Sequence, residues 1–122
     1  MTEKEKMQKQ MLYDANYDSE LIAERARAKE LCHAYTRLSP SDRAGQERIL
    51  RGLLGKAGAQ LCITAPFWCD YGYLIEVGEN FYANHNLVIL DGGGVRFGDN
   101  VFIAPNCGFY TSGHPIDFVR RN

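Results

Sequence analysis

The sequence has no excess of either charge sign and no long apolar segment. Its 122 residues hold 14 lysines and arginines against 15 aspartates and glutamates, which gives a formal net charge of −1. This balance excludes a general nucleic-acid-binding protein and a basic membrane-binding surface, because both need surplus positive charge. No apolar run approaches the roughly 18 residues of a membrane span. The charged first residues also lack the apolar centre of a signal peptide, so we expect a cytoplasmic protein.

Closely spaced cysteines are also missing. Cys32, Cys62, Cys69 and Cys107 form no CxxC pair and show no zinc-ligand spacing. In a protein without an export signal, this pattern predicts reduced thiols and no disulfide framework.

Charged and aromatic residues are divided unequally between the two halves. Residues 1–60 carry 20 charged and three aromatic side chains, whereas residues 61–122 carry nine and 11, and no lysine follows Lys56. Eight of the 12 glycines also follow residue 60. We therefore expect a helical module over residues 1–60 and strands with turns over residues 61–122.

Three helices are predicted in the first half. Thr2 is a suitable N-cap for the first helix, and Asp18 or Ser19 for the second. Pro40 predicts a new helical start, since proline suits the first turn of a helix. The expected positions are roughly residues 3–12, residues 19–38 and a stretch that includes Arg48–Leu54.

From Ile75 onward the sequence repeats with a period of six residues. Its segments VGENFY, ANHNLV, ILDGGGVR, FGDNVF, IAPNCG and FYTSGH all begin with an apolar residue. VGEN and FGDN lie 20 residues apart, which is three hexads plus two residues, and we interpret the glycines at 92–94 as the inserted pair. Such a repeat predicts a three-sided coil with lead residues inside, although a set of β-hairpins is the alternative. The expected corner residues, suited to unusual backbone, are Gly78, Asn80, Asn84, Asn86, Gly98, Asn100 and Asn106.

Several motifs together resemble one family. MLYD, CDYGYLIEVGENFYANHN, GDNVFIAPN and TSGHPID match, in order and approximate spacing, the maltose and galactoside O-acetyltransferases. The segment CDYGY is more similar to the maltose branch. The resemblance implies an α+β fold, in which an N-terminal helical module (1–60) precedes the first coils of a left-handed parallel β-helix (61–122).

The same resemblance implies a function. Members of this hexapeptide-repeat family transfer an acetyl group from acetyl-CoA to a hydroxyl, here of maltose, glucose or a related sugar. A cytoplasmic homotrimer is implied, with acetyl-CoA as co-substrate and no bound cofactor. Because the galactoside branch has a second aspartate where this chain has Gly92, galactoside specificity is not expected.

Site residues carry over by motif. His114 of GHP corresponds to the general base, and histidine suits this task because its unperturbed pKa is about 6.5. Asp14, Asp70 and Asn84 match acceptor-site positions, and carboxylates and amides can bond sugar hydroxyls. Chemistry alone leaves a helix cap open for Asp14 and a simple corner for Asn84. The further expected acceptor contacts are Tyr82 and Arg25.

Two other functions were weighed. A zinc site of the kind found in trimeric carbonic anhydrases needs three histidines, but His33 falls in a predicted helix, so no metal is expected.

We expect the acetyl-CoA contacts to lie on coils beyond Asn122. The 122 residues are therefore interpreted as a C-terminally truncated chain that is inactive alone. The alternative is a non-enzymatic structural or interaction remnant of the same family.

Overall fold

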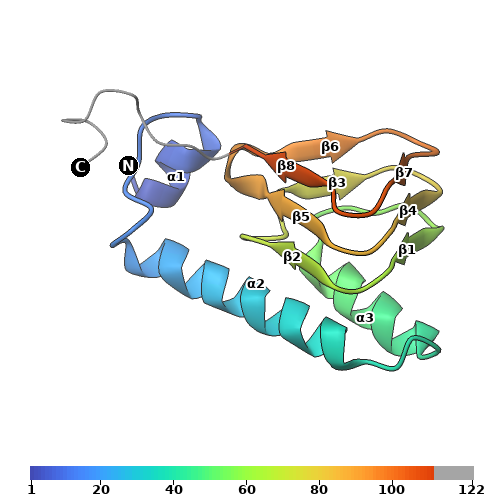
Figure 1. Cartoon of the computed structure of the whole chain (residues 1–122). Helices are drawn as coiled ribbons and strands as arrows, with labels where there is room; N and C mark the ends of the chain where they lie inside the picture. The colour runs from blue at the N-terminus through green and yellow to red at the C-terminus, as the bar shows by residue number, and fades with distance from the viewer. Residues whose placement is uncertain (112–122) are drawn as a thin grey trace.

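Helices come first in the chain and short parallel strands follow (Figure 1). The computed structural model describes residues 1–111. The helices are α1 (Glu3–Gln8), α2 (Ser19–Arg37) and α3 (Arg43–Leu53), with a 3-10 turn, η1 (Asp91–Gly93). The strands are β1 (Leu61–Ile63), β2 (Phe67–Cys69), β3 (Ile75–Val77), β4 (Phe81–Ala83), β5 (Leu87–Leu90), β6 (Val95–Phe97), β7 (Phe102–Ile103) and β8 (Gly108–Tyr110). Within the described range, no helix combines the length and the apolar character that a membrane crossing requires.

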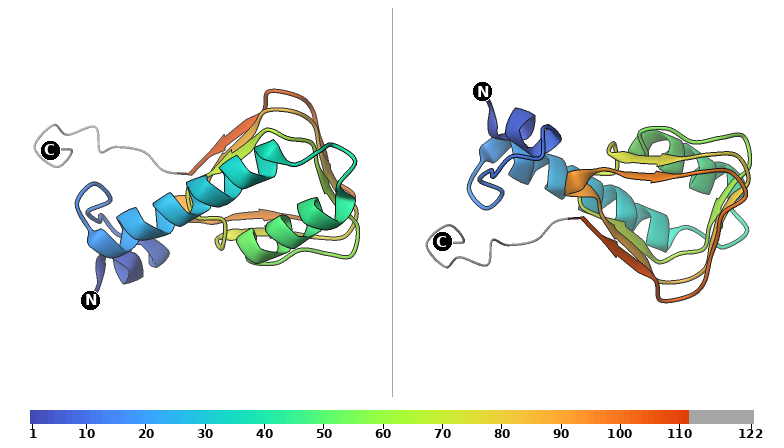
Figure 2. Two further views of the ribbon diagram at one scale, coloured as in Figure 1. Left: turned by 90° about the horizontal axis from the view of Figure 1, so that it is seen from below. Right: turned by 90° about the horizontal axis from the view of Figure 1, so that it is seen from above.

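The strands wind into a three-sided parallel coil that advances 20 residues per turn. On one face Tyr82 pairs with Phe102, and on another Phe67 pairs with Leu87. The three faces are β1-β4-β7, β2-β5-β8 and β3-β6, and Figure 2 shows the triangular outline that they form. The predicted α+β order and the three-sided coil are therefore confirmed.

The hexad phase predicted the inward positions correctly. The six lead residues all belong to the central apolar cluster, either buried in it or packed against it: Val77, Ala83, Ile89, Phe97, Ile103 and Phe109. The structure agrees with the interpretation of the glycine run as the inserted pair, because the lead residues on either side of it, Ile89 and Phe97, are eight positions apart and both contact the core. The first coil has the same 20-residue period without that run, as in Phe67 with Leu87. The segment from Asp70 to Leu74, between β2 and β3, forms the corner of the first coil that corresponds to the glycine run between β5 and β6.

Four of the seven predicted corner residues have left-handed backbone. Asn80, Asn86, Asn100 and Asn106 have φ between 58° and 66°. Their side chains form ladders between coils, in which one amide Nδ2 donates to the Oδ1 of the asparagine 20 residues later, at 3.1 and 2.9 Å. Gly78, Asn84 and Gly98 do not have this conformation. Gly78 is needed for another reason, because a Cβ there would lie 2.7 Å from the carbonyl oxygen of Gly98 on the next coil.

Helices α2 and α3 lie across the N-terminal end of the coil (Figure 2). Cys32 and Tyr35 of α2 and Leu50 and Leu53 of α3 are buried in the same cluster as the inward strand residues. The helices therefore supply the apolar floor of the coil.

The predicted helix caps are confirmed for two helices and wrong for the third. Thr2 Oγ1 accepts from the Glu5 N–H at 3.0 Å, and Asp18 Oδ2 accepts from the Leu21 N–H at 3.0 Å. The third helix does not begin at Pro40. It begins after Asp42, because that carboxylate accepts the Gly45 N–H at 2.9 Å and so caps the first turn. The first helix also ends at Gln8, earlier than expected.

Candidate functional site

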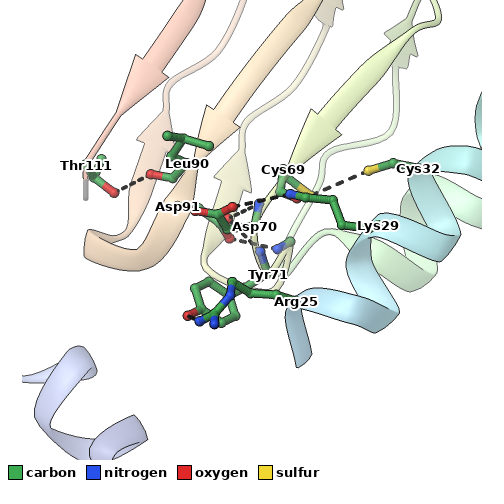
Figure 3. A network of polar contacts seen from close by, with 10 residues as sticks. Arg25, Lys29, Cys32, Cys69, Asp70, Tyr71, Leu90, Asp91 and Thr111 are labelled. Carbon is green, nitrogen blue, oxygen red and sulfur yellow. Dashed lines mark hydrogen bonds and ion pairs between the residues drawn. The ribbon is translucent and has the colours of Figure 1, made fainter. Parts of the chain in front are cut away.

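Polar side chains from α2 meet the end of β2 at one corner of the coil (Figure 3). Lys29 Nζ lies 3.3 Å from Asp70 Oδ1 and donates to the Cys69 carbonyl at 2.5 Å. Arg25 Nη1 donates to the Tyr71 hydroxyl at 2.8 Å. Together with the buried Asp91, which is described below, the side chains of Arg25, Lys29, Asp70 and Tyr71 form a group that we call the polar corner.

Arg25 also holds the loop between α1 and α2, on which Asp14 lies. Arg25 Nη2 donates to the Ala15 carbonyl at 2.5 Å, so this guanidinium joins the loop to Tyr71. The Asp14 N–H donates to Glu3 Oε1 at 2.6 Å, and Asp14 Oδ1 accepts the Tyr17 N–H at 3.1 Å. Asp14 thus turns the chain before α2, and it is also held on the loop that Arg25 ties to this corner.

Asp91 is fully buried and holds the corner from inside. Its Oδ1 accepts the N–H groups of Asp70 and Tyr71 at 3.2 and 2.9 Å, and its Oδ2 accepts that of Gly72 at 2.8 Å. Burial raises the pKa of Asp91, although the backbone hydrogen bonds act in the opposite direction. The result is a fixed backbone that presents the Asp70 side chain towards α2.

Sequence reasoning assigned no role to Lys29, Tyr71 or Asp91. For Asp91 a signal existed, since it is a lone carboxylate between a buried strand and a glycine run. For Lys29 there was none, because its partners are 40 and 41 residues away in the sequence.

Tyr82 and Asn84 lie on β4 and in the turn after it, apart from the polar corner that holds Arg25 and Asp70. Tyr82 lies on β4, is 36% exposed and makes an edge contact with Phe102, with ring centroids 6.2 Å apart. Asn84 follows β4, and its Oδ1 accepts the His85 N–H at 2.8 Å. The residues predicted to contact the sugar acceptor therefore form two groups. Tyr82 and Asn84 precede β5, whereas Asp70 lies beside the end of β5 on the previous coil.

The predicted base, His114, lies outside the described residues. Thr111, the last of these, bonds to residues on both sides of Asp91: its hydroxyl donates to the Leu90 carbonyl at 2.6 Å and accepts the Gly93 N–H at 2.8 Å. Of the other histidines, His33 lies exposed on α2 and His85 bonds the Ala65 carbonyl through Nδ1 at 2.7 Å. Across residues 1–111 no three His, Cys, Asp or Glu side chains are grouped as metal ligands would be.

Comparison with known proteins gives a consistent picture. Residues 6–58 match the model of the maltose acetyltransferase hexapeptide capping motif. The protein of Saccharomyces cerevisiae named "Putative acetyltransferase YJL218W" is 56% identical over 110 residues, which are 90% of this chain and 56% of the yeast protein. "Putative acetyltransferase SAR2635" of Staphylococcus aureus is 47% identical over 122 residues, which are 100% of this chain and 61% of that protein. The chain thus spans less than two thirds of these relatives.

Solved structures show the same fold. The maltose O-acetyltransferase from Clostridium difficile 630 superposes with a TM-score of 0.97 at 44% identity, over 100% of this chain and 65% of its own. A galactoside acetyltransferase in complex with coenzyme A gives a TM-score of 0.91 at 32% identity, over 99% and 60%. The coil is accordingly a left-handed parallel β-helix with an N-terminal helical cap.

Proposed function

The chain belongs to the maltose and galactoside O-acetyltransferase family, and we propose that the whole protein transfers an acetyl group from acetyl-CoA to a hydroxyl of maltose, glucose or a related sugar. A relative from Vibrio cholerae, 34% identical, has been solved with acetyl coenzyme A, which supports this donor. The proposal concerns the whole protein, because this chain covers 56% and 61% of the two relatives compared above.

The polar corner is the observation that carries the proposal. It holds Arg25 of α2 and Asp70 at the end of β2, and Arg25 also donates to the carbonyl of Ala15, which follows Asp14 on the α1–α2 loop. Carboxylate oxygens accept hydrogen bonds from sugar hydroxyls, so Asp14 and Asp70 can orient an acceptor. Thr111 bonds to residues on both sides of Asp91, and the sequence places His114 three positions further along.

The proposed reaction needs one base and no covalent enzyme intermediate. His114 takes the proton of the acceptor hydroxyl while the hydroxyl oxygen attacks the thioester carbon of acetyl-CoA. The carbon–sulfur bond then breaks, and the departing coenzyme A sulfur takes the proton from His114, which gives the free thiol and restores the base. An imidazole with a pKa near 6.5 suits this proton transfer at neutral pH.

The second group, Tyr82 and Asn84, bears on assembly. We propose that both contact the acceptor, yet they lie at the other end of β5 from Asp70. In a homotrimer, Tyr82 and Asn84 of one copy would lie next to the polar corner of a neighbouring copy and complete the acceptor site there. For the 122-residue chain alone we expect no turnover, because we place the acetyl-CoA contacts on further coils.

Release of free thiol from acetyl-CoA tests the proposal on the product of the complete reading frame. We expect maltose or glucose to stimulate thiol release, and His114→Ala to lower kcat by about 10²–10⁴-fold, the usual contribution of a general base. His33→Ala is the matched control and should leave the rate unchanged. Full activity in His114→Ala would exclude the assigned base. If no sugar hydroxyl is acetylated at all, the non-enzymatic alternative is favoured.

A further inference from the structure

A cavity of about 330 Å³ lies where the α2–α3 connection meets the first corner of the coil. Its volume is at the lower end of the range for small-molecule sites. None of the five acceptor residues proposed above lines it. The lining consists of Tyr35, Thr36, Leu38, Pro40, Arg43, Gln46, Cys62, Ile63, Thr64, Ala65, Pro66 and His85.

The only permanent charge among these lining residues is the guanidinium of Arg43. Across residues 1–111, no carboxylate lies within ion-pair distance of it. Glu47, one helical turn further along α3, forms an ion pair with Arg51 instead, with 2.8 Å between its Oε1 and Arg51 Nε. Arg43 is also the first residue of α3 and follows Asp42, whose carboxylate caps this helix by accepting the Gly45 N–H at 2.9 Å. The guanidinium of Arg43 itself, and not the end of the helix, is therefore the positive group that the cavity offers to a ligand.

Most of the remaining polar groups of the lining already have hydrogen-bond partners within the protein. The hydroxyls of Tyr35 and Thr36 already donate to the carbonyls of Ile63 and Cys32. Gln46 Nε2 makes only long contacts, 3.3 and 3.5 Å, with the carbonyls of Pro40 and Ser39. An acceptor group in the cavity would therefore gain new bonds from Arg43, and it could replace the long contacts of Gln46 with a shorter one.

We propose that this cavity binds a small organic carboxylate. Its acid group would bond Arg43 and Gln46, since a guanidinium can hold a carboxylate through two parallel bonds. Its apolar body would rest on the wall formed by Leu38, Pro40 and Ile63. A polyphosphate is disfavoured, because one guanidinium cannot neutralise several charges.

Cys62 offers a reporter inside the cavity. It is a half-buried free thiol, and Cys107 is a second half-buried free thiol that does not line the cavity. Iodoacetate and iodoacetamide both alkylate thiols, in a step where the sulfur bonds the methylene carbon and iodide leaves. The two reagents are similar in size but differ in charge, so the ratio of their rates at one site reports a preference for the anion.

The rates are measured for each cysteine by peptide mass spectrometry on the folded chain. We expect the iodoacetate-to-iodoacetamide ratio to be about threefold higher at Cys62 than at Cys107, which is the size of effect that an exposed charge pair gives. Arg43→Met should remove this difference. Arg48→Met, a change at an exposed arginine of the same helix outside the lining, should preserve it.

A second measurement tests binding directly. Benzoate at millimolar concentration should slow the alkylation of Cys62 by iodoacetamide but not that of Cys107, whereas the neutral isostere benzamide should protect Cys62 less. The proposal is overturned if the two sites show equal rate ratios, if the difference survives Arg43→Met, or if benzamide protects as well as benzoate. None of these outcomes depends on acetyl transfer, so they stand apart from the test of the proposed function.

Discussion

Replacing Asp91 with asparagine tests whether this buried carboxylate holds the polar corner. Oδ1 accepts two backbone N–H groups, from Asp70 and Tyr71, and Oδ2 accepts a third, from Gly72. An asparagine keeps only one of the two oxygens. In either orientation its NH₂ group therefore faces at least one N–H donor, and with the oxygen at the Oδ1 position that donor is the buried N–H of Gly72.

The expected loss of stability follows from this contact. A hydrogen bond to a charged group contributes about 1.5–3 kcal/mol, and a buried donor left without a partner costs about 1–3 kcal/mol. We therefore expect Asp91→Asn to lower the free energy of unfolding at pH 7 by about 2–4 kcal/mol. This is a large share of the roughly 5–15 kcal/mol that stabilises a typical domain.

Urea unfolding followed by tryptophan fluorescence measures the loss. Trp68 is the only tryptophan and lies on β2, two residues before Asp70. The matched control is Asp99→Asn, because the exposed Asp99 accepts a single N–H, that of Glu79 on the previous coil, at 2.7 Å. We expect the control to cost no more than about 1 kcal/mol. Equal midpoint shifts for the two variants would refute the assigned role of Asp91.

The difference in free energy of unfolding between the wild type and Asp91→Asn should also change with pH, in a direction that the pKa of Asp91 determines. Burial raises the pKa of Asp91 in the folded protein, and the neighbouring Asp70 acts in the same direction. A carboxyl with a raised folded pKa contributes most stability below its unfolded pKa, about 3.9, and loses this contribution as pH rises through the folded pKa. The stability difference between the wild type and Asp91→Asn should therefore be larger at pH 4 than at pH 7. A difference that grows with pH would mean that the three N–H bonds outweigh burial.

Two further predictions concern the surroundings of the corner. Gly72→Ala should destabilise the fold by at least about 2 kcal/mol more than Gly94→Ala: both glycines have positive φ, but only at Gly72 would a Cβ meet Leu53, at 2.5 Å. Urea midpoints check this, and equal shifts would contradict it. In the folded chain, Cys32 and Cys69 should resist iodoacetamide while Cys62 and Cys107 react, because the sulfurs of the first pair are fully buried, 3.9 Å apart, and their hydrogen bond together with burial raises the pKa of Cys69. Peptide mass spectrometry checks this, and native-state labelling of Cys69 would contradict it.

The coil could be predicted because its rule is local. A side chain at a lead position points inward whatever lies on the other faces, so hexad phase alone identified Val77, Ala83 and Ile103 as core residues. The helix caps at Thr2 and Asp18 were predictable for the same reason, since each contact spans three residues. The start of α3 was not, because Pro40 suits the first turn of a helix and Asp42 suits an N-cap, so the sequence indicates two different starting points.

The contacts of the polar corner could not be predicted from the sequence, and the acceptor-binding roles that the family resemblance gives to Arg25 and Asp70 stay a prediction. Its contacts join residues far apart in the sequence, 46 positions for Arg25 with Tyr71 and 41 for Lys29 with Asp70. No periodic pattern relates a residue of α2 to a strand end, because the position of α2 depends on how Cys32 and Tyr35 pack on the floor of the coil. Motif matching identified Arg25 and Asp70 but not their separation from Tyr82 and Asn84, which depends on the length of β5.

One type of hydrogen bond between neighbouring coils repeats at the corners, and it links the stability of the fold to the geometry of the proposed acceptor site. A polar side chain on one coil accepts a backbone N–H of the coil before it: Glu79 from Ala59, Asp99 from Glu79, and Asp91 from the segment after β2. At the first two corners the carboxylate is exposed to water, and the bond is worth little. At the third it is buried and serves three donors, so the backbone that carries Asp70 cannot shift without leaving a charged group unsatisfied. The geometry that we propose for acceptor binding is thus set by the coil above it, and changes at Asp91 should affect the position of Asp70 before they unfold the protein.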